Sequence, residues 1–113
     1  MIDEQVIPIM RVEEAAVAVA WYQALGFQKE WEHHFGPHLP AFVSIARGNV
    51  RLFLSEHTGD VRPATLVYLW VKDVFALAAR FQEQVREQPW AHEVELRDPD
   101  GNRPRMGTPK GQP

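Results

Sequence analysis

The sequence contains no cysteine. This excludes a disulfide framework, a cysteine-based zinc site and thiol catalysis. No apolar run is long enough to cross a bilayer, and the start Met1-Ile2-Asp3-Glu4 is acidic, unlike the basic start of a signal peptide. We therefore expect a cytoplasmic protein. A net charge of -3 and a pI near 5.9 make nucleic acid an unsuitable partner.

An internal repeat is the most informative feature that is present. Two stretches 59 residues apart each contain an apolar strand, a charged corner and an amphipathic helix, and Val12 and Tyr22 of the first match Val71 and Phe81 of the second. A repeat of this kind fixes the architecture of a fold. In a chain of 113 residues and 13.0 kDa, it predicts one domain over residues 1–113, built from two similar modules.

The first module, about residues 1–58, is expected to be βαβββ. Gly26 suits the left-handed end of a helix, and Gly48-Asn49 is a favourable hairpin turn. The expected elements are a strand at 5–11, a helix at 13–25 and strands at 27–35, 41–47 and 50–56.

The second module, about residues 64–108, repeats this start and is then shortened. Asp73 is a good N-cap, and Pro99-Asp100-Gly101-Asn102 is a turn signal. The expected elements are a strand at 65–71, a helix at 73–86 and strands at 93–97 and 103–108, the last weakened by Pro104. One strand of this module is truncated or missing, and the fold class is α+β.

Several segments resemble the vicinal oxygen chelate superfamily, which includes glyoxalase I, extradiol dioxygenases, fosfomycin-resistance enzymes and bleomycin-resistance proteins. They are Trp21-Tyr22-Gln23-Ala24-Leu25-Gly26-Phe27, Glu87-Gln88-Pro89-Trp90 and Arg97-Asp98-Pro99-Asp100-Gly101-Asn102. The second segment is most similar to the bleomycin-resistance branch. The resemblance implies tandem βαβββ modules over nearly the whole chain, but function depends on the site and not on the fold.

The resemblance also identifies where a divalent metal would be held. Those positions are occupied here by Ile7, Leu66 and Arg105, with the fourth near Arg51 or Leu52. Isoleucine and leucine have no donor atom, and arginine is a permanent cation. We therefore expect no metal cofactor and no inherited metal chemistry.

Five histidines leave an alternative open. His33 and His57 lie near Glu56 in a set that could form a relocated metal site. His33 and His34 are adjacent, so on a strand they point to opposite faces. The other interpretation is that the histidines are solvent-exposed or hydrogen bonded at strand ends.

Strand alternation predicts which side chains line a cleft between the sheets. Aromatic residues with a few fixed charges suit a planar, partly polar organic ligand. Alternatively, the charged residues pair with one another across strands. The residues expected to face the cleft are Ile9, Arg11, Arg51, Phe53, Tyr68, Trp70, Glu93, Glu95, Arg97, Arg103 and Arg105.

The resemblance adds two stacking residues. In bleomycin-binding proteins, the tryptophan of the EQPW segment and a phenylalanine of module one enclose the flat part of the drug from different subunits. Trp90 matches the first, Phe35 approximately matches the second, and Trp31 is a further candidate. The alternatives are a core position for Trp90 and an interface position for Phe35. A homodimer is expected, since most soluble oligomers are two-fold dimers.

The sequence therefore predicts a non-catalytic protein of the antibiotic-resistance kind that sequesters a flat ligand at a dimer interface. The ligand is expected to be a bleomycin-like drug or an aromatic anion. Bleomycin is cationic, whereas the expected cleft holds more arginine than glutamate, which favours the anion. The alternatives are a metal-dependent glyoxalase or dioxygenase with a relocated site, and a metal-free enzyme using Glu93, Glu95 or a histidine as base.

Overall fold

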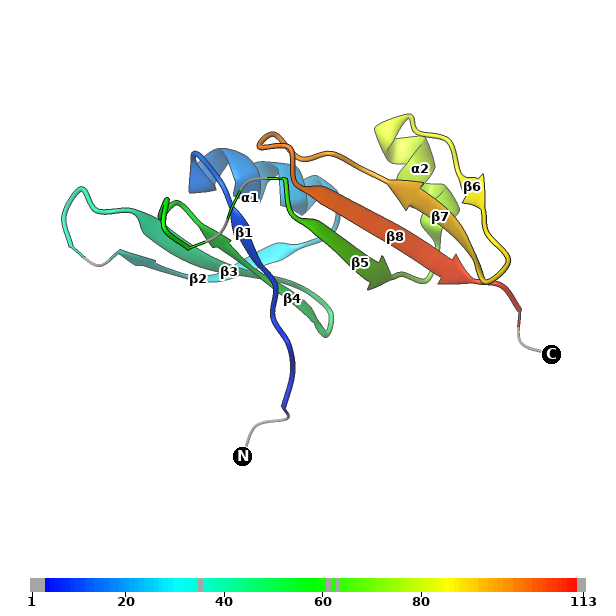
Figure 1. Cartoon of the computed structure of the whole chain (residues 1–113), viewed down its shortest axis with the longest axis horizontal. Coiled ribbons are helices and arrows are strands. Elements are labelled where there is room, and N and C mark those ends of the chain that lie inside the picture. Colours follow the sequence, from blue (N-terminus) through cyan, green and yellow to red (C-terminus); the bar gives the residue numbers. More distant parts are fainter. Residues whose placement is uncertain (1–3, 35, 61, 63, 112–113) are drawn as a thin grey trace.

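The computed structural model describes residues 4–34, 36–60, 62 and 64–111. Figure 1 shows both helices on one side of the strands, with the first module and the second module next to each other along the length of the molecule. The elements are β1 (Ile9–Arg11), α1 (Ala15–Ala24), β2 (Gln28–His34), β3 (Ala41–Arg47), β4 (Val50–Ser55), β5 (Leu66–Trp70), α2 (Val74–Phe81), β6 (Arg86–Glu87), β7 (Ala91–Glu95) and β8 (Arg103–Pro109).

The strands form two mixed sheets of the same design. The first has the order β1-β4-β3-β2 and the second the order β5-β8-β7-β6. In each sheet the first strand of the module pairs in parallel with the last, and the remaining pairs are antiparallel. This confirms the predicted α+β fold of tandem βαβββ modules. The truncated strand is β6, which has two residues where β2 has seven.

Several predicted boundaries were wrong. The second helix ends at Phe81 and not at Arg86, because Gln82 adopts a left-handed backbone with φ of 57° and closes it. Its predicted start is confirmed, since Asp73 accepts hydrogen bonds from the backbone N–H groups of Phe75 and Ala76. The first strand begins at Ile9 instead of residue 5, and the strand predicted at 93–97 lies at 91–95.

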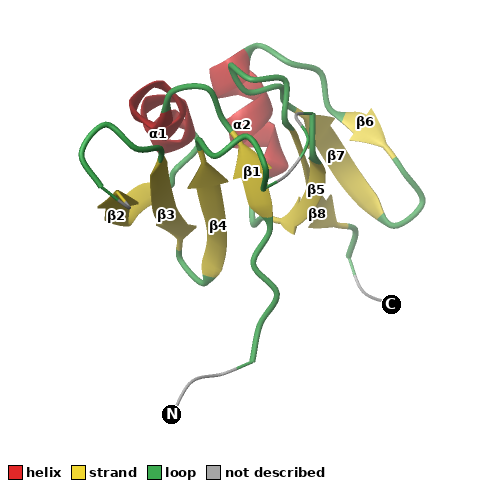
Figure 2. Ribbon diagram, turned by 60° about the vertical axis from the view of Figure 1, so that its left-hand side comes forward, coloured by secondary structure: helices red, strands yellow, loops and turns green. Residues whose placement is uncertain are grey.

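Alternation along the strands separates a core face from an open face. Side chains such as Leu52, Leu54 and Val94 are buried in the core. Figure 2 shows both helices, in red, on the same side of the strands. Their neighbours along each strand point away from the helices. We call that side of each sheet its open face. No helix in the described ranges is both long and apolar enough to cross a membrane.

A buried polar network joins the two modules. Tyr22 on α1 donates its hydroxyl hydrogen bond to Asp98 Oδ2 at 2.8 Å. Asn102 Nδ2 donates to the same oxygen at 3.0 Å and to the backbone oxygen of Arg11 at 2.9 Å, while its Oδ1 accepts from the Thr65 N–H. The turn predicted at 99–102 therefore also anchors the second module to the first.

Helix α1 begins without a side-chain cap of its own. Asp100 Oδ1 accepts a hydrogen bond from the Glu13 N–H at 2.8 Å, and Glu56 Oε2 accepts one from the Ala15 N–H at 2.7 Å. Asp100, in the turn before β8, and Glu56, after the end of β4, thus satisfy backbone donors at the start of α1 from distant parts of the chain. At α2, the Thr108 hydroxyl does the same for the Val74 N–H at 2.9 Å.

Candidate functional site

The open face of the first sheet carries an aromatic cluster. Trp31 stacks on Phe42 with ring centroids 6.1 Å apart, and Phe53 lies 5.5 Å from Trp31 and 5.1 Å from Phe42. The register explains this contact, because Trp31 pairs with Ser44, which pairs with Phe53. Trp31 remains 45% exposed, so the cluster presents aromatic surface to whatever lies over this face.

A closed ion pair lies beside this cluster. Glu30 falls at an irregularity in β2 between Lys29 and Trp31. Arg51 donates to both of its carboxylate oxygens, at 2.6 and 2.7 Å, and the Ser44 hydroxyl donates to one of them. These hydrogen bonds, chiefly those from Arg51, lower the pKa of Glu30 from 4.5 to about 2. The charge of Arg51 is therefore neutralised one to one.

The open face of the second sheet carries Tyr68 and Trp70, whose rings meet edge to face at 5.2 Å. Tyr68 crosses over Gly107, where any Cβ atom would overlap its hydroxyl, and donates a hydrogen bond to Glu93 Oε2 at 2.7 Å. Burial raises the pKa of Tyr68, the bond to Glu93 raises it further, and the nearby Trp90 side chain lowers it. Tyr68 is thus held as a neutral donor over a site only glycine permits.

Trp90 lies in the turn between β6 and β7. Gln88 N–H donates to the Ala91 oxygen at 2.9 Å, so Pro89 and Trp90 form a two-residue hairpin turn. Trp90 is 55% exposed, which excludes the core position considered for it. Its side chain lies near enough to Tyr68 to lower the pKa of that hydroxyl, so the turn extends the aromatic surface of the second open face.

One carboxylate serves two arginines on the same face. Arg103 Nε donates to Glu95 Oε2 at 2.8 Å, and Arg105 Nε donates to Glu95 Oε1 at 2.9 Å. The bond from Arg103 is the largest cause of a lowered pKa at Glu95. About a third of each of the two arginine side chains is exposed. The arginines therefore remain partly uncompensated.

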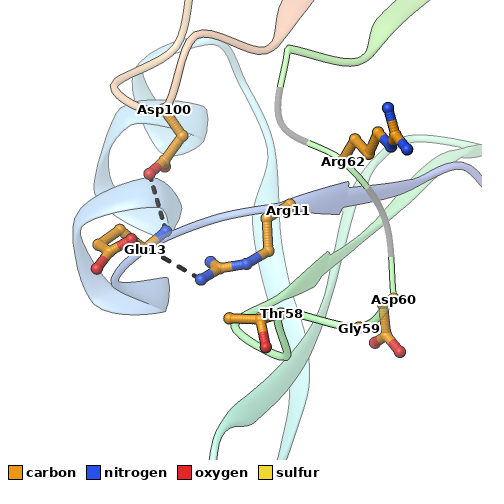
Figure 3. A pocket seen from close by; sticks show the side chains of 7 residues that line it. All are labelled: Arg11, Glu13, Thr58, Gly59, Asp60, Arg62 and Asp100. Carbon is orange, nitrogen blue, oxygen red and sulfur yellow. Dashed lines mark hydrogen bonds and ion pairs between the residues drawn. The ribbon is translucent and has the colours of Figure 1, made fainter.

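Two cavities open beside the first sheet. The one in Figure 3, of about 760 Å³, is lined mainly by charged residues, and Arg11 Nη2 lies 3.8 Å from Glu13 Oε2 within it. The adjoining cavity, of about 710 Å³, includes Ile9 and Phe42 and reaches the open face. The first is lined by Arg11, Glu13, Thr58, Gly59, Asp60, Arg62 and Asp100; the second by Ile9, Leu39, Pro40, Phe42, Glu56, His57, Thr58 and Asp60.

The residues do not fit the metal that the superfamily pattern implies. Ile7, Leu66 and Arg105 offer no ligand at three of the positions. In the alternative set, both Glu56 oxygens already accept backbone hydrogen bonds, from Ala15 and Ala41, and His57 Nδ1 accepts one from Gly59. Across the described part of the chain, no three His, Asp or Glu side chains are grouped to hold a metal ion.

The structure gathers the predicted ligand-binding residues into two groups. Trp31 and Phe53 lie on the first open face, and Tyr68, Trp70, Trp90, Glu95, Arg103 and Arg105 lie on or beside the second. Phe35 lies outside the described residues. His33 lies opposite Phe42 in the register. Their role in binding stays a prediction.

Sequence reasoning missed Phe42, Glu30 and Arg86. Phe42 could have been found, because Val43 and Ile45 are apolar and alternation turns Phe42 to the open face. Glu30 depends on the irregularity in β2, which has no clear signal in sequence. Arg86 was assigned to the helix, but it lies in β6 and pairs with Glu93 of β7.

Comparison with solved structures identifies the same fold. An antibiotic-binding protein, TnmS3, from Streptomyces sp. CB03234 is 21% identical, with a TM-score of 0.77 over 97% of this chain and 100% of that chain. A bleomycin-binding protein from Streptomyces verticillus, complexed with copper(II)-bleomycin, is 23% identical, with a TM-score of 0.72 over 97% and 100%. At these identities the likeness shows the fold alone.

A third solved structure, a bleomycin-binding protein complexed with bleomycin, is 18% identical with a TM-score of 0.75 over 96% of this chain and 100% of that chain. No curated protein sequence matches the chain. The model of a family described as glyoxalase superfamily protein matches residues 1–111. The chain therefore belongs to the glyoxalase superfamily and has the vicinal oxygen chelate fold of the bleomycin-binding proteins.

Proposed function

We propose that this protein is a non-catalytic binding protein that sequesters a flat small molecule between the open faces of two copies of the chain. The observation that carries the proposal is the aromatic lining of both faces. Three rings in mutual contact cover the first, and Tyr68, Trp70 and Trp90 cover the second. Aromatic faces bind planar ligands by stacking, at low cost in side-chain entropy.

The exposed area supports a second copy as the cover. A monomer of 13.0 kDa is expected to expose roughly 6,300 Å², whereas this chain exposes 7556 Å². The excess exceeds the area that one partner buries in a standard interface, about 800 Å². The radius of gyration of 14.9 Å also exceeds the roughly 13 Å expected for a compact domain of this length.

Chemistry favours binding over metal catalysis. The superfamily positions for a metal hold side chains that cannot ligate a metal ion, and both Glu56 oxygens already accept backbone hydrogen bonds, from Ala15 at the start of α1 and Ala41 in β3. The solved neighbours include an antibiotic-binding protein and bleomycin-binding proteins. We extend that binding of small molecules, and its role in resistance by sequestration, to this chain as part of the proposal.

The test is a titration with bleomycin, both metal-free and copper-loaded, followed by tryptophan fluorescence and calorimetry. We expect saturable binding with one ligand per chain, lost or strongly weakened in Trp90→Ala. The matched control is Phe75→Ala, because Phe75 on α2 is an aromatic of similar exposure, 53% against 55%, on the helix side of the sheet. Weakening by both variants alike would count against a stack at Trp90.

If bleomycin does not bind, the same titration is made with a panel of planar antibiotics. Failure of every planar ligand to bind would overturn the proposed function.

The assembly is tested separately by sedimentation equilibrium, where we expect twice the 13.0 kDa chain mass. Trp70→Glu places a charge on the second open face, and we expect it to produce monomers. A wild-type chain that stays monomeric at high concentration would refute the two-copy cleft.

A further inference from the structure

We propose that the open face of the second sheet selects planar aromatic ligands that carry an anionic group, such as a carboxylate or sulfonate, and that Arg103 and Arg105 bind this group. The inference rests on the proposed binding function and names the class of ligand that the site prefers. It follows from charges, hydrogen-bond donors and strand lengths on this face.

The charge of this face is opposite to that of the chain. Three arginines and two glutamates lie on it: Arg86, Arg103, Arg105, Glu93 and Glu95. Three positive and two negative charges leave a net charge of +1, whereas the whole chain carries -3. An anion is therefore drawn to this face against the field of the rest of the protein.

Free donors make the charge usable. Hydrogen bonds to Glu95 occupy Nε and Nη2 of Arg103 and Nε of Arg105, and Nη2 of Arg105 forms an ion pair with the same carboxylate. Among the residues that the structure describes, no hydrogen bond engages Nη1 of either side chain. A guanidinium offers five N–H donors in a planar fork that matches a carboxylate or sulfonate. Two such forks therefore remain partly available.

The shortened strand explains why these donors are unpaired. In the first sheet, β2 continues along β3 as far as Gln28, which pairs with Ala46, and it supplies Glu30 to close the pair with Arg51. In the second sheet, β6 pairs only with His92 and Glu93. No β6 residue therefore lies opposite Glu95 or beyond it, where the counterparts of Trp31 and Glu30 would lie.

Aromatic surface lies directly beside the cations. Arg105 is the register partner of Tyr68, and Gly107 is the partner of Trp70. A ring stacked on Tyr68, Trp70 or Trp90 would thus bring its substituent to the guanidinium groups. Glu93 accepts a hydrogen bond from the Tyr68 hydroxyl and pairs with Gly107, farther along β8 from Arg103. Its carboxylate disfavours anions placed at that end of the face.

Two fluorescent probes of one shape test the inference. The first is 8-anilinonaphthalene-1-sulfonate, and the second is N-phenyl-1-naphthylamine, which lacks the sulfonate. We expect the sulfonate to bind the full-length chain roughly tenfold more tightly, the factor for one charge-assisted hydrogen bond. This ratio should fall as salt is added, because exposed charges are screened.

Variants of opposite sign keep the test independent of folding. Arg105→Gln should bring the ratio of the two affinities close to one, and Glu95→Gln should raise it above the wild-type value. Misfolding cannot produce both changes. Arg80→Gln is the control, because it removes the same charge from α2, on the other side of the sheet, and it should leave the ratio unchanged.

The outcomes separate the two proposals. Equal affinity for both probes in the wild-type chain would overturn anion selection and leave aromatic binding standing. The same holds if Arg80→Gln lowers the ratio as much as Arg105→Gln, since the preference would then arise from overall charge. If neither probe saturates, the selectivity is refuted, and the titrations with bleomycin and planar antibiotics decide the proposed function separately.

Discussion

Tyr22→Phe is expected to destabilise the protein by removing one hydroxyl from the network that joins the modules. Tyr22 is fully buried and Asp98 nearly so, and their hydrogen bond is 2.8 Å long. Burial, followed by the charge of Asp98, raises the pKa of Tyr22, so the hydroxyl stays a donor throughout the working pH range. The carboxylate would lose one of its partners without water to replace it.

The size of the effect follows from the type of bond. A hydrogen bond to a charged group contributes about 1.5–3 kcal/mol. For 113 residues, an unfolding entropy of about 240 cal/mol/K converts a loss of about 2 kcal/mol into a fall in Tm of about 8 °C. The measurement is urea and thermal unfolding followed by circular dichroism, at one fixed protein concentration in case subunits associate.

Tyr68→Phe is the matched control, because Tyr68 is the other tyrosine of the chain and also donates to a carboxylate, Glu93 at 2.7 Å. Glu93 is buried like Asp98, but its donor Tyr68 is 41% exposed where Tyr22 is 0% exposed, so water can reach the position that the lost hydroxyl leaves. We expect a cost of no more than about 1 kcal/mol. If Tyr22→Phe costs no more than Tyr68→Phe, the argument that burial makes this bond essential is wrong.

Three further predictions concern other contacts. Asn102→Ala should cost roughly 2–4 kcal/mol, because it removes three hydrogen bonds, one of them to Arg11 of the other module; a smaller loss in urea unfolding would count against the network. Gly107→Ala should displace Tyr68 and abolish ligand binding while the helical circular dichroism is retained. The pKa of Glu30, lowered to about 2, should return toward 4.5 in Arg51→Gln, as carbon-13 NMR can follow. The wild-type ion pair therefore stabilises fully above pH 4.5 and loses its effect as the pH falls toward 2.

The fold could be predicted because its signals are local or periodic. Strand alternation correctly divided residues such as Leu52 and Phe53 between the two faces of a sheet. The repeat predicted that both modules share one topology. The start of α2 was predictable because an aspartate cap acts within three residues, from Asp73 to Ala76.

The rest depends on contacts between distant residues or on small backbone choices. Asp98 was recognised as part of a turn, but its bond to Tyr22 crosses 76 positions of sequence, and no local pattern encodes it. The end of α2 depends on one left-handed residue, Gln82, a conformation for which glycine or asparagine would have been the usual signal. The closed pair of Glu30 likewise depends on a local irregularity.

The repeat shows which positions the fold requires and which remain available for binding. Glu56 and Thr108 each follow the last residue that pairs with the first strand of the module, Ser55 or Gly107. Each accepts a bond from an equivalent helix N–H, of Ala15 or Val74. An acid and a hydroxyl perform the same structural task there, because only an acceptor at that point is needed.

The open faces are under no such constraint. Ile9 and Tyr68 hold equivalent places in β1 and β5, as do Phe53 and Arg105 in β4 and β8, and each pair differs completely in chemistry. Since both modules bury apolar residues on the core side of these strands, such as Leu54 in β4 and Met106 in β8, these differences change little in the packing. Divergence between copies can therefore give one sheet an aromatic surface with a closed ion pair and the other an aromatic surface with partly exposed arginines, and a ligand lying between two such faces would contact both.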